Sequence, residues 1–115
     1  TTNETIYFGI GPVSNVTNIN VAGTATATNF ILSSDKTLKD KIKNIKANHV
    51  DVKWKNFELI SEPGVKRSGV IAQELEEKHP EFIRTDKDGL KSVAYIDLLI
   101  TKIAELEARI KKLEK

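Results

Sequence analysis

The sequence predicts an α+β chain in two parts: a short β-rich arm over residues 1–33, and a small helix/strand domain over residues 34–115 that ends in a long coiled-coil helix at about 95–115. Three observations predict this organisation. Glu4 is the only charged side chain of the arm, whereas all 18 Lys and Arg lie after it. Apolar residues alternate in several short runs, which is typical of strands. A heptad pattern near the C-terminus indicates a coiled coil and therefore a homo-oligomer.

Length and composition exclude several classes of protein. The 82 residues that follow residue 33 can bury only a modest core in one chain, which favours oligomerisation. The chain has no cysteine, and therefore neither a disulfide framework nor a thiolate metal site. Its net charge of +2 is too small to indicate nucleic-acid binding, and no apolar run is long enough to span a membrane. We expect no cofactor, no metal, no nucleic-acid partner and no membrane partner, and we expect a longer parent chain upstream of residue 1.

The arm is rich in Thr, Asn, Val, Gly and Ala and carries weak strand patterns. Residues 6–8 form a short β-like run that Gly9 ends, residues 13–21 alternate loosely, and residues 23–31 continue in the same style. Such a segment has little to bury by itself. It is typical of an intertwined β-structure, in which other chains complete each sheet.

Residues 37–47 predict an amphipathic helix at the start of the charged part. Leu38, Ile42 and Ile45 recur at helical spacing, with lysines on the remaining faces. Ser34 or Asp35 is suited to cap its N-terminus. The lysines could form a phosphate-binding patch, but a solvated helix face is favoured, because acids interrupt the run and no aromatic residue is interleaved.

Ser34 and Lys39 could form a nucleophile and its base. A serine hydroxyl attacks only when a base takes its proton, and an amine is such a base only when it is neutral. Residues five apart on one helix do not face each other, so Ser34 must lie in the extended segment before the helix, with Lys39 reaching back. The positive end of the helix would disfavour a charged ammonium, and its free N–H groups could hold an oxyanion. On spacing alone, a helix cap and a surface lysine are the favoured alternative.

The middle of the chain predicts a strand, a turn and a short helix. Residues 50–60 alternate as a strand, with Trp54 expected as a core anchor. A turn at residues 62–64 precedes a helix over residues 70–78, which His79-Pro80 ends because proline cannot continue it.

A β-hairpin is predicted after this helix. Residues 82–85 and 90–93 are the two expected strands, joined across residues 86–89. Asp86 and Asp88 suggest a calcium loop, but the remaining ligands of such a loop are missing, so a plain turn is favoured.

Two sets of apolar residues repeat every seven positions in residues 95–115. They are Ile96, Ile103 and Ile110 at one heptad position, and Leu99, Leu106 and Leu113 at the other. We expect these six residues to form the interface of a parallel coiled coil, in which Lys102 and Arg109 pair with Glu107 and Glu114 of a neighbouring chain. An isolated helix of this length is marginal, so its folding should be coupled to assembly.

The heptads leave the number of chains open. Isoleucine at position a with leucine at position d favours two strands. Ile100 at an e position widens the apolar seam, and the pattern of residues 109–114 resembles one that recurs in trimeric coiled coils. We therefore expect a trimer.

Several stretches resemble one protein family in order along the chain. The pattern Ser34-Asp35-x-x-Leu38-Lys39 resembles the processing motif of the intramolecular chaperone domains at the C-termini of phage tail spikes and tail fibres, of the endosialidase type. Residues 26–30 resemble the last strand before that site. Residues 69–75, followed by His79-Pro80-Glu81, resemble the family's signature block, and residues 93–95 are similar to the entry into its C-terminal helix. The resemblance covers roughly residues 24–115.

The resemblance implies a self-cleaving serine endopeptidase that acts once. By analogy with the family's serine–lysine dyad, Ser34 is the nucleophile, Lys39 is the base, and the cut lies between Ser33 and Ser34. We hypothesise an N-to-O acyl shift followed by ester hydrolysis. Asp35, Gln73 and Glu74 could support the site, although a plain structural role is favoured for Gln73 and Glu74.

The resemblance also implies a homotrimer whose partner is the upstream fibre or spike chain. The domain would nucleate folding of the fibre in the host cytoplasm and then be released, leaving the mature fibre in the virion tail. One alternative is a trimerisation tail that never cleaves. Another is a processing module like that of the myelin regulatory factor, which frees a transcription factor. The uncharged arm favours a fibre, because a DNA-binding neighbour should be basic.

Overall fold

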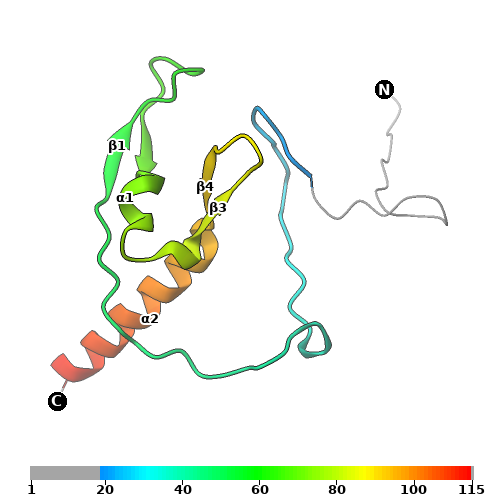
Figure 1. The fold of residues 1–115 in the computed structure, drawn as a ribbon. Helices are drawn as coiled ribbons and strands as arrows, with labels where there is room; N and C mark the ends of the chain where they lie inside the picture. Colours follow the sequence, from blue (N-terminus) through cyan, green and yellow to red (C-terminus); the bar gives the residue numbers. More distant parts are fainter. Residues whose placement is uncertain (1–18, 115) are drawn as a thin grey trace. The chain divides into compact units, whose positions relative to one another are not determined.

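The structure, a computed structural model, describes residues 19–114 and divides the chain into two compact units, Thr1–Asp40 and Lys41–Lys115. The run predicted at residues 6–8 and most of the run at residues 13–21 lie outside the described residues. Short strands and a long C-terminal helix confirm the α+β class for the described part (Figure 1). None of the helices described between residues 19 and 114 is long and apolar enough to cross a membrane.

The described part of the arm forms no strand. Residues 24–35 have no regular secondary structure, so the strand expected at residues 26–30 is wrong for this chain. Phe30, Ile31 and Leu32 are all exposed. A lone extended segment has no neighbour to satisfy its backbone groups or cover its side chains, which explains why the strand does not form.

The helix predicted over residues 37–47 is also wrong. The structure has a single 3-10 turn, η1 (Lys36–Leu38), after which Lys39 returns to extended backbone and Lys41 takes a positive φ of 52°. Ile42 and Ile45 are exposed, so the apolar stripe that predicted the helix has nothing to pack against. Most helices of this length depend on such packing for their stability.

The second unit is built on a small apolar core. Its buried members come from five separate segments and are Val50, Val70, Leu75, Phe82, Ile83 and Leu98. Leu98 is completely buried. A core of this size contributes little for a chain of this length, which agrees with the expectation that one chain alone is marginal.

The strand expected over residues 50–60 is shorter in the structure. Strand β1 (Lys55–Phe57) pairs antiparallel with β2 (Arg67–Gly69), with Lys55 opposite Gly69. Trp54 is 50% exposed, so its assignment as a core anchor is wrong for the single chain. The core residue of this region is Val50, which lies in the irregular segment before β1.

Gly69 ends β2 where another segment passes close to it. A Cβ built on Gly69 would lie 2.3 Å from the Tyr95 hydroxyl oxygen, so only glycine leaves room. That hydroxyl accepts a hydrogen bond from the Val70 N–H at 3.0 Å. The glycine therefore lets the end of the first sheet meet the start of the last helix.

The short helix and the hairpin occur where the sequence predicts them. Helix α1 (Ala72–Glu76) ends before η2 (Pro80–Phe82). Strands β3 (Ile83–Thr85) and β4 (Lys91–Val93) then form the antiparallel hairpin.

A side-chain cap closes the hairpin turn. The Asp86 carboxylate accepts from the N–H groups of Asp88 and Leu90, and Gly89 has a φ of +84°. The turn predicted at residues 86–89 is therefore confirmed.

Helix α2 (Tyr95–Leu113) confirms the predicted C-terminal helix (Figure 1). Its side chains form two different faces. One face buries Leu98 and Glu105 against the rest of the unit. The other carries the six heptad residues, which are between 44% and 84% exposed. The helix thus has an unpartnered apolar seam, and its use in a coiled coil stays a prediction.

Candidate functional site

Ser34 and Lys39 lie side by side at the start of the charged part. Lys39 Nζ is 2.5 Å from Ser34 Oγ. Ser34 is in the extended segment ahead of η1, as the spacing argument requires. The turn η1 reverses the chain between the two residues, because Leu38 N–H donates to Asp35 O and Lys39 N–H donates to Lys36 O.

Asp35 caps this turn. Its Oδ1 accepts from the Thr37 N–H at 2.9 Å and from the Thr37 hydroxyl at 2.8 Å. These two hydrogen bonds hold the pKa of the Asp35 carboxyl below its usual value, the backbone bond contributing most. Asp35 therefore fixes the geometry of the turn that joins the two dyad residues, which is the cap that the sequence predicts.

The predicted electrostatic support for Lys39 is not present. Lys39 follows the last residue of η1, so it lies at the wrong end of the turn to feel a positive helix terminus. The N–H groups of Thr37, Leu38 and Lys39 are used within the turn and are not open to an oxyanion. The expected helix dipole and oxyanion donors at this position are therefore wrong, because the helix itself does not form.

The dyad is exposed in the single chain. In this contact Lys39 Nζ donates a hydrogen bond to the Ser34 hydroxyl oxygen, whereas a general base must be neutral and accept a hydrogen bond from that hydroxyl. The contact geometry suits both states. Removal of water is the change that converts one into the other.

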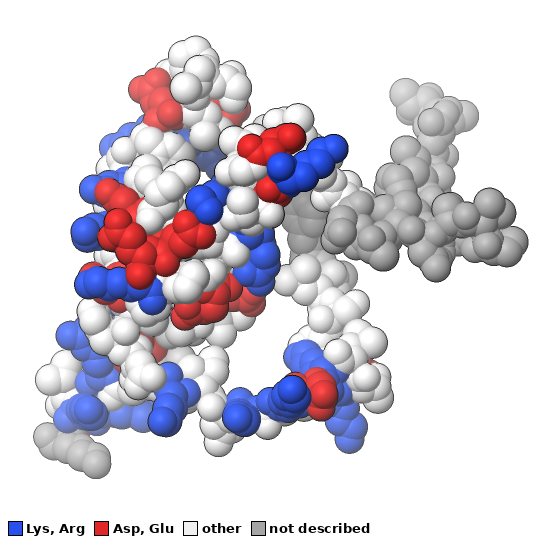
Figure 2. All heavy atoms as spheres, in the orientation of Figure 1, with Lys and Arg blue, Asp and Glu red and all other residues white. Residues whose placement is uncertain are grey.

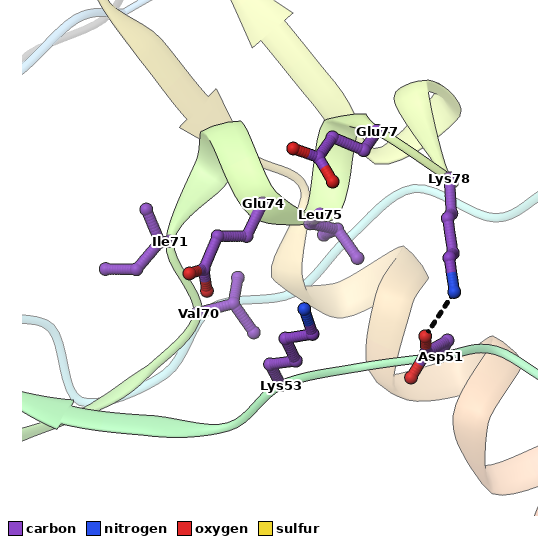
Figure 3. Close-up of a pocket in the computed structure, with 8 residues that line it drawn as sticks. All are labelled: Asp51, Lys53, Val70, Ile71, Glu74, Leu75, Glu77 and Lys78. Carbon is purple, nitrogen blue, oxygen red and sulfur yellow. Dashed lines mark hydrogen bonds and ion pairs between the residues drawn. The ribbon is translucent and has the colours of Figure 1, made fainter.

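Gln73 and Glu74 lie on α1 in the second unit, and their support of cleavage stays a prediction. Glu74 lines a small hollow of about 20 Å³, beside Lys53 and the ion pair of Asp51 with Lys78 (Figure 3).

That ion pair ties the segment after Val50 to the end of α1. Lys78 Nζ is 2.7 Å from Asp51 Oδ2. The hydrogen bond lowers the pKa of Asp51 and raises that of Lys78. The hollow has room for a water molecule but not for a substrate.

A buried cluster on α2 was missed by sequence reasoning. Glu105 is 3% exposed and is the one charged side chain buried among residues 19–114. Its Oε1 accepts from the Val50 N–H and from Lys102 Nζ, each at 2.9 Å. Its Oε2 lies 2.9 Å from His49 Nδ1 and 3.3 Å from Arg109 Nη1. These contacts lower the pKa of Glu105 to about 2, the Val50 N–H contributing most.

The cluster gives two cations of α2 partners within their own chain. Lys102 and Arg109 both contact Glu105. Their pairing with Glu107 and Glu114 of a neighbouring chain stays a prediction. Lys102 Nζ also donates to the Val50 carbonyl oxygen at 2.9 Å. The sequence signal that could have revealed this second buried face of α2 is Leu98. It is an apolar residue that lies outside the heptad seam and seven positions before Glu105.

The described residues offer no place for a metal. No group of three or more His, Cys, Asp or Glu side chains between residues 19 and 114 is arranged to bind one. Basic and acidic side chains are interspersed on the face of the molecule that Figure 2 shows.

One family model matches this chain: Peptidase_S74, described as the chaperone of endosialidase, over residues 34–84. The match confirms the resemblance stated from the motifs. It begins at Ser34, the predicted nucleophile, and includes Lys39 and the signature block. No curated protein and no solved structure matches the chain.

Proposed function

From the match of residues 34–84 to the chaperone of endosialidase family, we propose that this chain is an intramolecular chaperone that trimerises a phage tail fibre or spike and then cuts itself free between Ser33 and Ser34. The family supports the chaperone role in fibre assembly. The contact of Lys39 Nζ with Ser34 Oγ at 2.5 Å is the observation that supports cleavage. Two side chains at this distance are within reach for proton transfer.

The trimer is proposed from the seam of α2. Six heptad residues of this helix remain exposed, and Ile100 beside them is exposed as well. An apolar stripe of this length on a soluble helix marks a protein interface. Ile100 broadens the stripe beyond the width that two helices need, which favours three chains.

Assembly supplies what the single chain lacks for cleavage. Ser34 and Lys39 are exposed, so the lysine is a poor base until water is removed. Three chains held together by their helices raise the local concentration of the arms. Interlocked arms would cover the dyad and make cutting conditional on correct assembly.

The proposed cut proceeds in two steps. Ser34 Oγ attacks the carbonyl carbon of Ser33 while Lys39 takes the hydroxyl proton. The amide nitrogen of Ser34 leaves with a proton from Lys39, so an ester replaces the peptide bond. Water then hydrolyses the ester to the Ser33 carboxylate and the Ser34 hydroxyl. The new N-terminus is Ser34, and the reaction runs once per chain.

Separation would make the fibre kinetically stable. A released chaperone no longer holds the three chains in register, so an unfolded fibre could not easily refold, and the folded state would persist because unfolding is slow. The domain would thus act in assembly and be absent from the mature fibre.

A trimerisation tail that never cleaves is the second candidate. The specific observation in its favour is that Asp35 already caps η1, and the Lys39–Ser34 contact then resembles a hydrogen bond on an exposed turn. In this case α2 would have the same role, and residue 33 would remain joined to residue 34.

Intact-mass spectrometry of freshly synthesised chains tests the proposal. Wild type should give fragments of 33 and 82 residues, the second beginning with Ser34, whereas Ser34→Ala and Lys39→Ala should stay whole. Lys36→Ala is the matched control, because Lys36 belongs to the same turn, and it should cut normally. Whole chains in every sample would leave the trimerisation tail as the function. Hydroxylamine should trap the ester if the acyl shift occurs.

A further inference from the structure

Side chains of helix α2 bind both backbone polar groups of one residue, Val50. The N–H of Val50 donates to Glu105 Oε1, and the carbonyl oxygen of Val50 accepts from Lys102 Nζ, each at 2.9 Å. Both polar groups of Val50 are therefore bonded to side chains of the same helix. We call the contacts of Glu105 and Lys102 with Val50 the clamp.

The clamp exists only while α2 is helical. Glu105 and Lys102 are three residues apart, and they meet at 2.9 Å because one helical turn brings them to the same face. Glu105 is buried, so its carboxylate needs these partners to offset the loss of water. If α2 unravels, Val50 loses both bonds and the segment before it is released.

The segment held by the clamp leads directly to the dyad. Between Lys39 and His49 the chain has no helix or strand. Ten residues of extended chain reach at most about 35 Å, so a fixed Val50 limits how far Lys39 can move from α2. Val50 is also held by the burial of its side chain in the core, and Asp51 beside it is tied to Lys78, so the clamp acts together with these contacts. The next regular element after Val50 is β1, which begins at Lys55.

We propose that Glu105 and Lys102 are positioning residues for self-cleavage, because the clamp ties the dyad by a short tether to the helix whose opposite face assembles. Cleavage would thereby depend on a folded α2. This inference rests on the proposed function and adds to it the route by which assembly reaches the cut. A shorter tether keeps the dyad at a higher local concentration near the assembled chains.

Removal of the clamp should slow cleavage without preventing assembly. In Glu105→Ala the tether lengthens from about ten residues to at most about fifteen, the residues between Lys39 and β1, and the −3/2 power of length predicts a rate up to about 2-fold lower. Lys111→Ala is the matched control on the exposed side of the same helix and should cut at the wild-type rate. Cell-free synthesis, sampled over time by intact mass, gives the rate. Light scattering and circular dichroism give the assembly and helix content.

A tether insertion tests the same idea without touching the folded unit. Twenty Gly and Ser residues placed between Asn44 and Ile45 lie in an irregular segment. They lengthen the tether about 3-fold and should slow cleavage about 5-fold. In this background Glu105→Ala should cost only a further factor of about 1.3, because the tether is already long. A merely structural role for Glu105 would cost the same factor in both backgrounds.

The outcomes separate this inference from the proposed function. If wild type never cuts, the proposed function fails, and this inference fails with it. If wild type cuts and the insertion cuts at the same rate, the tether has no role and only this inference is overturned. If Glu105→Ala fails to fold, the insertion alone decides. Equal factors for Glu105→Ala in the two backgrounds would also overturn it.

Discussion

The junction turn and the clamp use similar polar contacts in opposite surroundings. At the junction, Lys39 contacts Ser34 five residues away and both are exposed. At the clamp, Lys102 and Glu105 contact Val50, more than fifty residues away in the chain, and Glu105 is buried. The exposed contact of Lys39 with Ser34 contributes little to the free energy of folding, whereas the contacts of Glu105 and Lys102 with Val50 hold distant segments together. Under the proposed function, the residues that cut the chain are placed by a local turn, whereas the dependence of cleavage on assembly comes from contacts between distant segments.

The largest expected effect comes from a change at the junction. Lys39→Arg keeps a positive donor near Ser34, but a guanidinium cannot act as a base in a protein. Loss of general-base catalysis typically costs 10²–10⁴-fold, so cleavage should fall by about that factor. Intact-mass time courses measure it. Wild-type rates in Lys39→Arg would show that the lysine acts only as a hydrogen-bond donor.

Adjacent leucines on α2 sharpen the comparison of its two faces. Leu98→Ala removes a completely buried side chain and should lower the free energy of unfolding by about 2–5 kcal/mol. Leu99→Ala lies on the exposed seam and should instead weaken assembly while the unit stays folded. Urea titrations and light scattering at matched concentrations separate these effects. The same response from both variants would remove the distinction between the faces.

Acid should release the clamp. Hydrogen bonds from Val50, His49 and Lys102 lower the pKa of Glu105 to about 2, so its contribution to stability is complete above the pKa of about 4.5 of an unfolded glutamate and is lost as the pH falls toward 2. Helicity at 222 nm should fall across that window. Glu105→Gln should flatten the change. An unaltered acid transition in this variant would assign the loss to other carboxylates, of which Asp51 also has a lowered pKa.

The smallest effect is expected where the first sheet meets α2. Gly69→Ala places a methyl group 2.3 Å from the Tyr95 hydroxyl oxygen and should cost about 1–3 kcal/mol of stability. The Tyr95→Phe background should reduce that penalty, because the hydroxyl is the closest atom. Thermal denaturation of the four-variant cycle measures the coupling. Additive effects would place the strain elsewhere.

Periodic and local patterns were the predictable part of this chain. The heptads gave helix α2, and Asp86 with Gly89 gave the hairpin turn, because both depend on neighbours in sequence. The helix at residues 37–47 failed for the opposite reason. Leu38, Ile42 and Ile45 have the spacing of an amphipathic helix, but spacing alone does not show whether another part of the protein covers the apolar face. In the structure all three side chains are exposed.

The candidate site also has a part that local sequence predicts and a part that it does not. Ser34, Asp35 and Lys39 were found by spacing and motif, and their local geometry follows from one capped turn. Glu105 was missed because it reads as an ordinary surface acid on a charged helix. Its burial depends on Val50, which is close only after folding, and no short pattern contains both.

Both members of the dyad lie on the same side of the proposed cut. If the proposed cut occurs, Ser34 and Lys39 would stay with the released piece, and the upstream chain would keep only the carboxylate of Ser33. The arm then contributes a carbonyl and nothing else to the reaction. Such a module is portable: it could be transplanted behind an unrelated shaft, mature that shaft, and leave no protease behind in the finished particle. Exchange of shafts by recombination ahead of Ser34 would thus carry no cost in processing.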